Sequence, residues 1–424
     1  MSDHDFAYFL VAVGHLLLAA HAGGRLFQAL RQPRVVGEIS GGLVLGPTLL
    51  ASLSPDWHAT VFGREGTQVA LGAVNKIGLM LLMFCSGLEL PAGFPRAERR
   101  TAAFVIGAGT LLPVAVALAC GRVVDFTAHY GPAATPLAFD LVVAIAVAVT
   151  SIPVLSKIMM ELKLLDTPFA RVVLTAAVVE DVMLYVLLSI AVAMALPLPR
   201  AATLGLAHWL GVPDGTWSVV YHVVVTLVFF ALALSLGPTC YRRITQARFK
   251  LVGSTSHLGY LLTFLVVASG LAMFLDVQLM FGAFLAGVVA STSTDPPEPQ
   301  RRAAKAFANA FFVPLFFAMV GLRLNLRLGV PWIFFAAFFV LACVIKAGSV
   351  YIGARWAGVA RKSALNLAAA MNARGGPGIV LASVAIEAGI INDGFYACLV
   401  LLAMLTSLMA GSWLGRAVRA GPLL

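Results

Sequence analysis

The fold of this chain is decided by one apolar stretch, Phe169-Ala-Arg-Val-Val-Leu-Thr-Ala-Ala-Val-Val-Glu-Asp-Val-Met-Leu-Tyr-Val-Leu-Leu-Ser-Ile-Ala-Val192. As a helix, this stretch is long enough to cross a bilayer whose hydrocarbon core is ~30 Å thick. Two adjacent acids, Glu180 and Asp181, lie near its middle. An ionisable side chain at that depth costs roughly 3 kcal/mol to insert, so the presence of two points to a function.

Composition places the rest of the chain in a membrane as well. Apolar residues make up 60% of the 424 residues and charged residues 11%, and the mean hydropathy is +0.94. These values exclude a soluble globular protein, and we expect the first apolar run to be retained because no cleavage site follows it. The basic residues that give the net charge of +10 lie in alternate loops, and this distribution argues against a nucleic acid partner. The five cysteines match no metal site or disulfide framework.

Hydropathy predicts thirteen transmembrane spans. They cover approximately residues 6–25, 34–53, 71–90, 101–121, 137–158, 169–195, 217–239, 256–275, 277–292, 307–324, 331–354, 363–388 and 395–416. The loops after the odd-numbered spans are rich in basic residues: Arg25, Arg31, Arg34, Arg96, Arg99, Arg100, Lys157, Lys163, Arg171, Arg242, Arg243, Arg248, Lys250, Arg301, Arg302, Lys305, Arg355, Arg361, Lys362, Arg416 and Arg419. The other loops carry fewer: Arg64, Arg122, Arg200, Arg323 and Arg327. Since basic loops stay in the cytoplasm, we expect the N-terminus outside and the C-terminus cytoplasmic. Strong use of Arg over Lys and of Ala suits a high-GC bacterium, so we expect a bacterial inner (plasma) membrane.

Two pairs of similar segments indicate an internal repeat. Residues 82–90 and 316–324 both end in Gly-Leu-charge-Leu, and Gly37-Glu-Ile-Ser-Gly-Gly-Leu-Val is similar to Gly282-Ala-Phe-Leu-Ala-Gly-Val-Val. These matches pair spans two to six with spans nine to thirteen, about residues 34–195 and 277–416. Because each copy has five spans, the second copy must enter the membrane upside down. We therefore expect a single transmembrane domain over residues 1–424, built from two inverted repeats.

The fourth span of each copy carries helix-breaking residues. The first is Val149-Thr-Ser-Ile-Pro153, and the second is Asn372-Ala-Arg-Gly-Gly-Pro-Gly378, which contains Gly375, Gly376 and Pro377. Unwound backbone at the midplane is tolerated only where it is buried or lines a cavity. We therefore expect two crossed, broken helices around a shared ion site, with Thr150 and Ser151 at the first break as ligands.

Four charges at membrane depth have to balance: Glu180, Asp181, Lys346 in span eleven and Arg374 at the second break. Adjacent helical residues point ~100° apart, so the two acids cannot face the same partner. We expect Glu180, which reaches further, to pair with a base, and Asp181 to carry a monovalent cation or a proton. Lys346 and Arg374 compensate the charge. The alternative is a static lattice of all four charges that only holds the helices together.

The run Val149-Thr-Ser-Ile-Pro-Val-Leu-Ser-Lys-Ile-Met-Met-Glu-Leu-Lys-Leu-Leu, with Ala176-Ala-Val-Val-Glu-Asp-Val, resembles the monovalent cation/proton antiporter superfamily. Further matches are Val35-Val-Gly-Glu-Ile-Ser-Gly-Gly-Leu-Val-Leu-Gly-Pro, Phe84-Cys-Ser-Gly-Leu-Glu-Leu and Asn372-Ala-Arg-Gly. They are similar to the branch of bacterial sodium/proton antiporters, potassium efflux systems and plant cation/proton exchangers. The resemblance implies the all-α, thirteen-helix sodium/proton antiporter fold, a six-helix core that moves against a dimerisation scaffold, and a homodimer.

The resemblance also implies roles for single residues. By position, Asp181 matches the ion-binding aspartate, Thr150 and Ser151 the unwound site, and Lys346 the core lysine. Glu180 departs from the family, whose members usually carry Asp, Asn or Gln at this position. In the family, this position is associated with whether exchange is electrogenic. We expect no cytosolic nucleotide-binding domain, since the sequence ends at Leu424.

The expected function is secondary active antiport of a monovalent cation (Na⁺ or K⁺) against protons by alternating access in the lipid bilayer. The alternative is a sodium-coupled organic solute symporter of the same fold, which would not need a titratable Asp181. A channel would need a continuous pore and usually a filter motif, and none is visible in the sequence. No nucleophile–base pair or metal motif suggests an enzyme, and we expect no cofactor.

Overall fold

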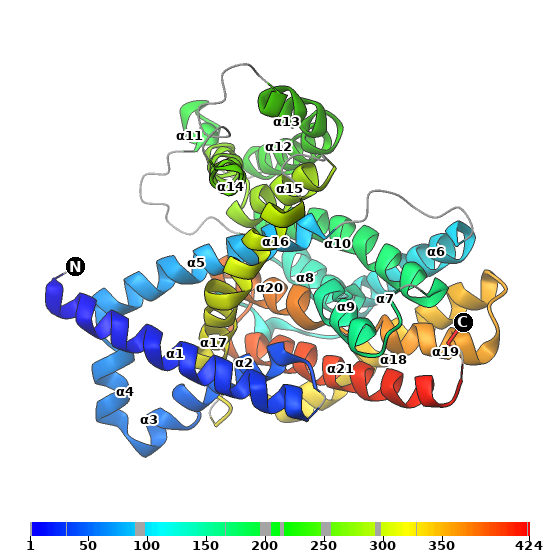
Figure 1. The fold of residues 1–424 in the computed structure, drawn as a ribbon, viewed down its shortest axis with the longest axis horizontal. Coiled ribbons are helices and arrows are strands. Elements are labelled where there is room, and N and C mark those ends of the chain that lie inside the picture. The colour runs from blue at the N-terminus through cyan, green and yellow to red at the C-terminus, as the bar shows by residue number, and fades with distance from the viewer. Residues whose placement is uncertain are drawn as a thin grey trace. The chain divides into compact units, whose positions relative to one another are not determined.

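The computed structural model describes residues 2–30, 32–89, 98–165, 167–195, 205–212, 216–246, 256–292, 298–327, 329–421 and 423–424. These residues form helices and contain no β-strand, apart from one isolated bridge between Tyr130 and Ile391. The elements, shown in Figure 1, are α1 (Asp3–Ala29), α2 (Arg34–Leu45), α3 (Leu50–Leu53), α4 (Pro55–Phe62), α5 (Glu65–Leu88), α6 (Arg99–Ile106), η1 (Gly107–Leu111), α7 (Leu112–Cys120), η2 (Thr127–His129), α8 (Pro136–Ala148), α9 (Ile152–Glu161), α10 (Pro168–Met194), α11 (Leu206–Trp209), α12 (Thr216–Ser235), α13 (Gly237–Gln246), α14 (His257–Phe274), α15 (Leu279–Ser291), α16 (Glu298–Phe307), η3 (Ala308–Phe312), α17 (Val313–Arg323), α18 (Trp332–Trp356), α19 (Arg361–Ala370), α20 (Gly375–Glu387) and α21 (Asp393–Arg419).

Eight stretches of helix in the described part are long and apolar enough to cross a membrane, and a bent pair at 220–245 would make nine. Four shorter apolar helices, α8, α14, α15 and α20, overlap the remaining predicted spans. The chain is therefore an all-α polytopic membrane protein, while the total of thirteen spans stays a prediction. Among the loop residues used to predict the topology, Arg31, Arg96, Arg200, Arg248 and Lys250 lie outside the described residues.

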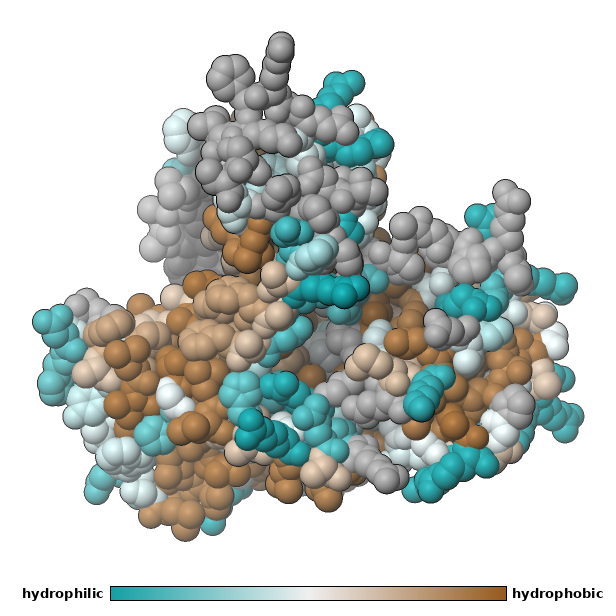
Figure 2. Space-filling view, viewed as in Figure 1, coloured by the Kyte–Doolittle hydropathy of each residue, from teal (hydrophilic) through white to brown (hydrophobic). Residues whose placement is uncertain are grey.

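Hydrophobic side chains cover much of the visible surface, drawn in brown in Figure 2. Ile333 on α18 is 91% exposed and Leu18 on α1 is 74% exposed. Such exposure would be unfavourable in water, where large apolar patches are rare. It fits helices whose outer faces contact lipid.

The chain forms two compact units. The first comprises residues 1–17, 60–92 and 199–316, and it includes a close pair, α5 and α15. These two helices touch at Gly87 and Gly287, where an added Cβ would meet the backbone of the other helix. The second comprises residues 18–59, 93–198 and 317–424 and contains every predicted site residue. The two inverted repeats, 34–195 and 277–416, stay a prediction.

Local sequence explains where the helices of the second unit begin. Thr135 caps α8 by accepting a hydrogen bond from the Ala138 amide, and Thr167 caps α10 in the same way from Ala170. In both cases a proline follows at the first helical position, where its missing N–H costs nothing. Arg171, one of the basic residues expected in a cytoplasmic loop, forms an ion pair with Glu98 at 2.7 Å, so its charge is partly neutralised.

The two predicted helix breaks are present. The first separates α8 from α9 at residues 149–151, and the second separates α19 from α20 at residues 371–374. The second break lies just before the Gly375-Gly-Pro377 cluster, which forms the first turn of α20. Gly375 itself has a φ of +36°, which strains any other residue. The cluster thus starts the second half-helix, and the unwound residues precede it.

Candidate ion site

A buried ion pair joins α10 to α18. The Lys346 Nζ lies 2.9 Å from Glu180 Oε1, and both side chains are 0% exposed. Lys346 also donates to the backbone oxygens of Gly109, at 2.9 Å, and Ala148. An ammonium group has three donors, so all three are used. Because each charge is compensated, the pair can persist at membrane depth.

The second acid, Asp181, has a different environment on the same helix. It is 1% exposed, and neither carboxylate oxygen has a hydrogen-bond partner among the described residues. The Glu180 and Lys346 charges both interact electrostatically with it. A buried carboxylate without partners is costly unless it binds a proton or a cation. Within the described part of the chain, Glu180 leaves only its Oε2 atom without a partner, whereas Asp181 leaves both oxygens, so Asp181 has the larger unused binding capacity.

A π-helical turn, η1, supplies two contacts to the ion pair. Thr110 donates a hydrogen bond of 3.3 Å to Glu180 Oε1, and the Gly109 carbonyl accepts from Lys346. A Cβ at Gly109 would lie 3.2 Å from Glu180 Oε1 and 3.1 Å from Val350 Cγ2, so a larger residue would crowd the ion pair. A π-helical turn alters the usual hydrogen bonding of a helix and is frequent at functional sites. Sequence analysis missed both residues, and the only signal was the run Gly107-Ala-Gly-Thr110 inside an apolar span.

Arg374 neutralises the end of a helix and pairs with no carboxylate in the described residues. Its guanidinium donates to the carbonyl oxygens of Ala146 at 2.8 Å, Val147 at 3.0 Å and Ala342 at 2.9 Å, and to Asn372. Ala146 and Val147 belong to the last turn of α8, which is the negative end of the helix dipole. A buried cation at this position compensates the unsatisfied carbonyls exposed by the break.

The two breaks contact each other directly. The Ser151 amide donates to the Ala373 carbonyl at 2.6 Å, and Thr150 Oγ1 donates to the Met371 carbonyl at 2.7 Å. Ser151 Oγ accepts from the Val154 amide and caps α9. Both hydroxyl groups are buried, and each keeps acceptor capacity beyond these bonds. The structure therefore brings all of the predicted site residues into one unit, with Pro153 in the first turn of α9.

The chemistry of the donor set fits a monovalent cation better than a resident divalent metal. Within the described residues, no group of three or more His, Cys, Asp or Glu could hold a metal ion. Asp181 offers two carboxylate oxygens, and oxygen ligands suit a hard cation. The fold and these residues together define an integral membrane protein with a buried acid, Asp181, on a helix that packs against the interrupted helices.

Comparison with known proteins agrees with this class. Residues 16–420 match the family model described as sodium/hydrogen exchanger, transmembrane, and the chain belongs to that family. The chain is 27% identical over 394 residues to the Na(+)/H(+) antiporter NhaS4 of Synechocystis sp., covering 91% of each protein. It is 26% identical to the cation/H(+) antiporter 17 of Arabidopsis thaliana, covering 96% of this chain and 48% of that protein. The chain thus spans about half the length of this plant relative.

The sodium proton antiporter MjNhaP1 from Methanocaldococcus jannaschii, solved at pH 8, shares the fold with a TM-score of 0.68. That alignment covers 98% of this chain and 99% of the other at 14% identity. The expected sodium/proton antiporter fold is therefore confirmed. The family and its relatives give no support to the alternative of an organic solute symporter.

Proposed function

We propose that this protein exchanges a monovalent cation, Na⁺ or K⁺, for protons, and that Asp181 binds the two in turn. The observation that carries the proposal is the fully buried Asp181 carboxylate, whose oxygens have no hydrogen-bond partner in the described chain. Its neighbour Glu180 is held by Lys346, so the two acids have separate tasks. The relatives named above as Na⁺/H⁺ and cation/H⁺ antiporters support the same class of substrate.

The proposed mechanism is competition followed by movement. A proton or a cation neutralises Asp181, and an empty carboxylate has to stay in contact with water because its desolvation is costly. Movement of the site between the two sides of the membrane is then possible only when Asp181 is loaded. Thr150 and Ser151 would add neutral oxygens to the cation, since their hydroxyls retain acceptor capacity.

The Glu180–Lys346 pair and Arg374 act as a fixed frame in this proposal. Lys346 ties α18 to the end of α8 and to α10, and Arg374 ties the second break to the same end of α8. The alternative of a static lattice predicts that Asp181 also has a fixed partner. Its oxygens have none among the described groups, which favours a transport role.

Membrane placement and assembly complete the proposal. We infer an N-terminus outside and a C-terminus in the cytoplasm from the basic residues of alternate loops. We infer a bacterial inner membrane from the strong use of Arg over Lys and of Ala. A homodimer in the lipid bilayer is carried over from the resemblance to the antiporter superfamily. Crosslinking in native membranes and accessibility labelling of single cysteines at either terminus test these two statements.

The decisive experiment measures proton movement after cation addition in proteoliposomes. An acid-interior pH gradient is imposed, and Na⁺, Li⁺ or K⁺ is added to the wild type, to Asp181→Asn and to Asp125→Asn. Asp125 lies in an exposed loop and receives the same chemical change. We expect Asp181→Asn to abolish cation-driven dissipation of the gradient and Asp125→Asn to retain it. Equal activity of Asp181→Asn and wild type would refute the assignment.

A further inference from the structure

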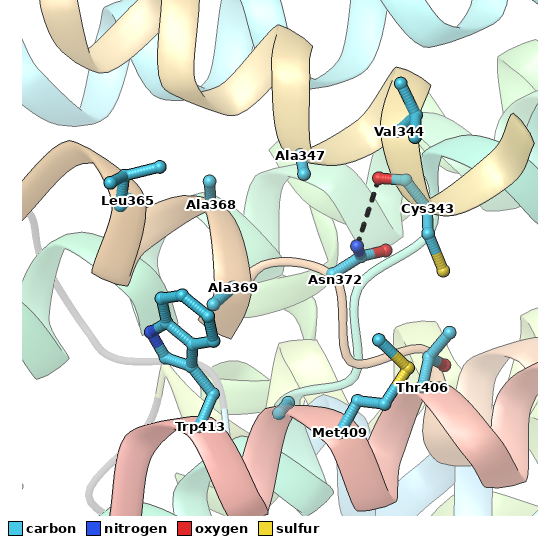
Figure 3. A pocket seen from close by; sticks show the side chains of 11 residues that line it. Cys343, Val344, Ala347, Leu365, Ala368, Ala369, Asn372, Thr406, Met409 and Trp413 are labelled. Carbon is cyan, nitrogen blue, oxygen red and sulfur yellow. Dashed lines mark hydrogen bonds between the residues drawn. The ribbon is translucent and has the colours of Figure 1, made fainter. Parts of the chain in front are cut away.

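An apolar groove lies beside the second helix break. It has a cavity volume of about 300 Å³ and is lined by α18, α19 and α21, as Figure 3 shows. Its lining residues are Cys343, Val344, Ala347, Leu365, Ala368, Ala369, Asn372, Thr406, Met409, Ala410 and Trp413. Val344 is 63% exposed and Met409 is 51% exposed, so the groove opens at the surface of this unit. We call it the α18–α21 groove.

One end of the same three helices is strongly basic. Five exposed cations lie there, namely Arg355, Arg361, Lys362, Arg416 and Arg419. The sequence contains no Asp or Glu between Lys346 and Glu387, and none after Asp393. On these three helices the nearest acid is Asp393, which lies at the opposite end of α21 from Arg416 and Arg419. We call the five cations the basic rim.

The groove and the basic rim are close enough for one ligand to reach both. With a rise of about 1.5 Å per residue, Trp413 and Arg416 are about 5 Å apart along α21, and Ala347 and Arg355 about 12 Å apart along α18. Side-chain bonds hold the helices together at this end. Lys362 Nζ donates to the Ala420 carbonyl at 3.1 Å, and Trp413 Nε1 donates to Asn366 Oδ1 at 3.3 Å.

From this juxtaposition we propose that the α18–α21 groove binds one acyl chain of an anionic phospholipid, whose phosphate contacts the basic rim. The lining is apolar except for Asn372 and Thr406, and those two are engaged with Cys343 and Arg374. Each cation near a membrane surface attracts anionic lipid, and Arg binds phosphate through its planar fork of donors. The ligand thus has an apolar tail and a negatively charged head.

A second copy of the chain fits this surface less well. In a two-fold dimer with both protomers in the same membrane orientation, the same patch faces itself at the same depth. The basic rim would then face another basic rim, and like charges disfavour that contact. A phospholipid instead brings the opposite charge to the rim and a narrow tail to the groove.

Lipid binding to the purified full-length protein in a neutral detergent tests the proposal. Dioleoyl phosphatidylglycerol, dioleoyl phosphatidylcholine and glycerol phosphate are titrated separately, with bound lipid counted by native mass spectrometry and with the melting temperature as a second readout. We expect phosphatidylglycerol to bind at least tenfold more tightly than phosphatidylcholine. Glycerol phosphate, which has no acyl chain, should bind weakly or not at all.

Two sets of variants separate the tail from the head. Ala347→Phe fills the groove from α18 and Ala369→Phe from α19, and Val340→Phe is the control on an exposed position of α18. Arg361→Gln with Lys362→Gln removes two rim charges, and Arg242→Gln with Arg243→Gln removes two exposed charges elsewhere. We expect each groove variant to weaken phosphatidylglycerol binding about tenfold and the rim variant to weaken it about 30-fold. The controls should bind as the wild type does.

Several results would overturn the proposal. Equal binding of the two phospholipids removes the role of the rim, and unchanged binding in both groove variants removes the role of the groove. A change of oligomeric state in the groove variants, with lipid binding unaffected, would mean that a second copy covers this face. None of these readouts depends on transport, so the lipid site and the proposed exchange at Asp181 can fail independently.

Discussion

Replacing Lys346 by Met removes the charge of the buried pair while keeping a side chain of similar length. Lys346 donates to Glu180, Gly109 and Ala148, so the change leaves two backbone carbonyls and one carboxylate without their shared donor. Glu180 Oε1 then keeps the 3.3 Å bond from Thr110. A 0% exposed carboxylate then stands nearly alone.

The expected loss follows from the burial of the pair. Removing one partner of a buried ion pair typically costs about 3–5 kcal/mol, because the other charge is left uncompensated. An unfolding entropy of about 2.1 cal/mol/K per residue, taken over the chain, converts this loss to a decrease of about 3–6 °C in melting temperature. Lys76→Met, on an exposed position of α5, is the matched control and should change the melting temperature by less than about 1 °C.

A double-mutant cycle identifies the origin of the loss. Glu180→Gln alone should also destabilise, because it leaves Lys346 buried without its anion, whereas the double variant removes both charges. We expect the double variant to recover most of the loss, with an interaction energy of at least about 2 kcal/mol. The melting temperatures of purified protein, followed by intrinsic fluorescence, provide the measurement. Additive losses, or a Lys346→Met protein as stable as the wild type, would refute the reasoning.

Three further predictions rest on other contacts of the site. Gly375→Ala should lower the free energy of unfolding by at least about 1–2 kcal/mol and impair exchange, because φ is +36° and the new Cβ meets Val154 and Ser151. Thermal melting measures the first effect and the proteoliposome assay the second. The control is Gly376→Ala, whose Cβ meets nothing within 4 Å. Thr110→Val should cost about 1 kcal/mol in thermal melts through the lost bond to Glu180, while Thr110→Ser should cost much less, and equal losses would exclude the hydrogen bond as the cause. Exchange should be electroneutral, with one proton per cation, because all three N–H donors of Lys346 are occupied and the ammonium group keeps its protons. An exchange rate that changes when valinomycin clamps the membrane potential at different values would contradict this.

Much of the site could be predicted from sequence because charged side chains cost free energy to insert into a membrane. The charges of Glu180, Asp181, Lys346 and Arg374 are conspicuous in apolar spans, and energy balance alone requires some of them to be compensated. The helix breaks could be located from proline and glycine, because proline removes a backbone donor and glycine adopts backbone angles that other residues avoid.

Other contacts could not be predicted, because they involve backbone atoms or depend on packing. The carbonyl partners of Arg374 are main-chain groups of α8 and α18, and no side-chain pattern marks them. The role of Thr110 depends on the π-helical turn η1, whereas hydropathy predicts only a continuous span there. The unwound residues 371–374 precede the glycine cluster because Gly375 accepts the strained backbone at the start of α20.

The bond between the Ser151 amide and the Ala373 carbonyl has a consequence for how this protein tolerates mutation. Both atoms belong to the main chain, so any residue except proline at position 151 keeps the donor, and every residue at position 373 keeps the acceptor. Most side-chain substitutions at positions 151 and 373 therefore leave the hydrogen bond between the interrupted helices in place. Substitutions can alter the side chains around this link while the main-chain bond itself is kept.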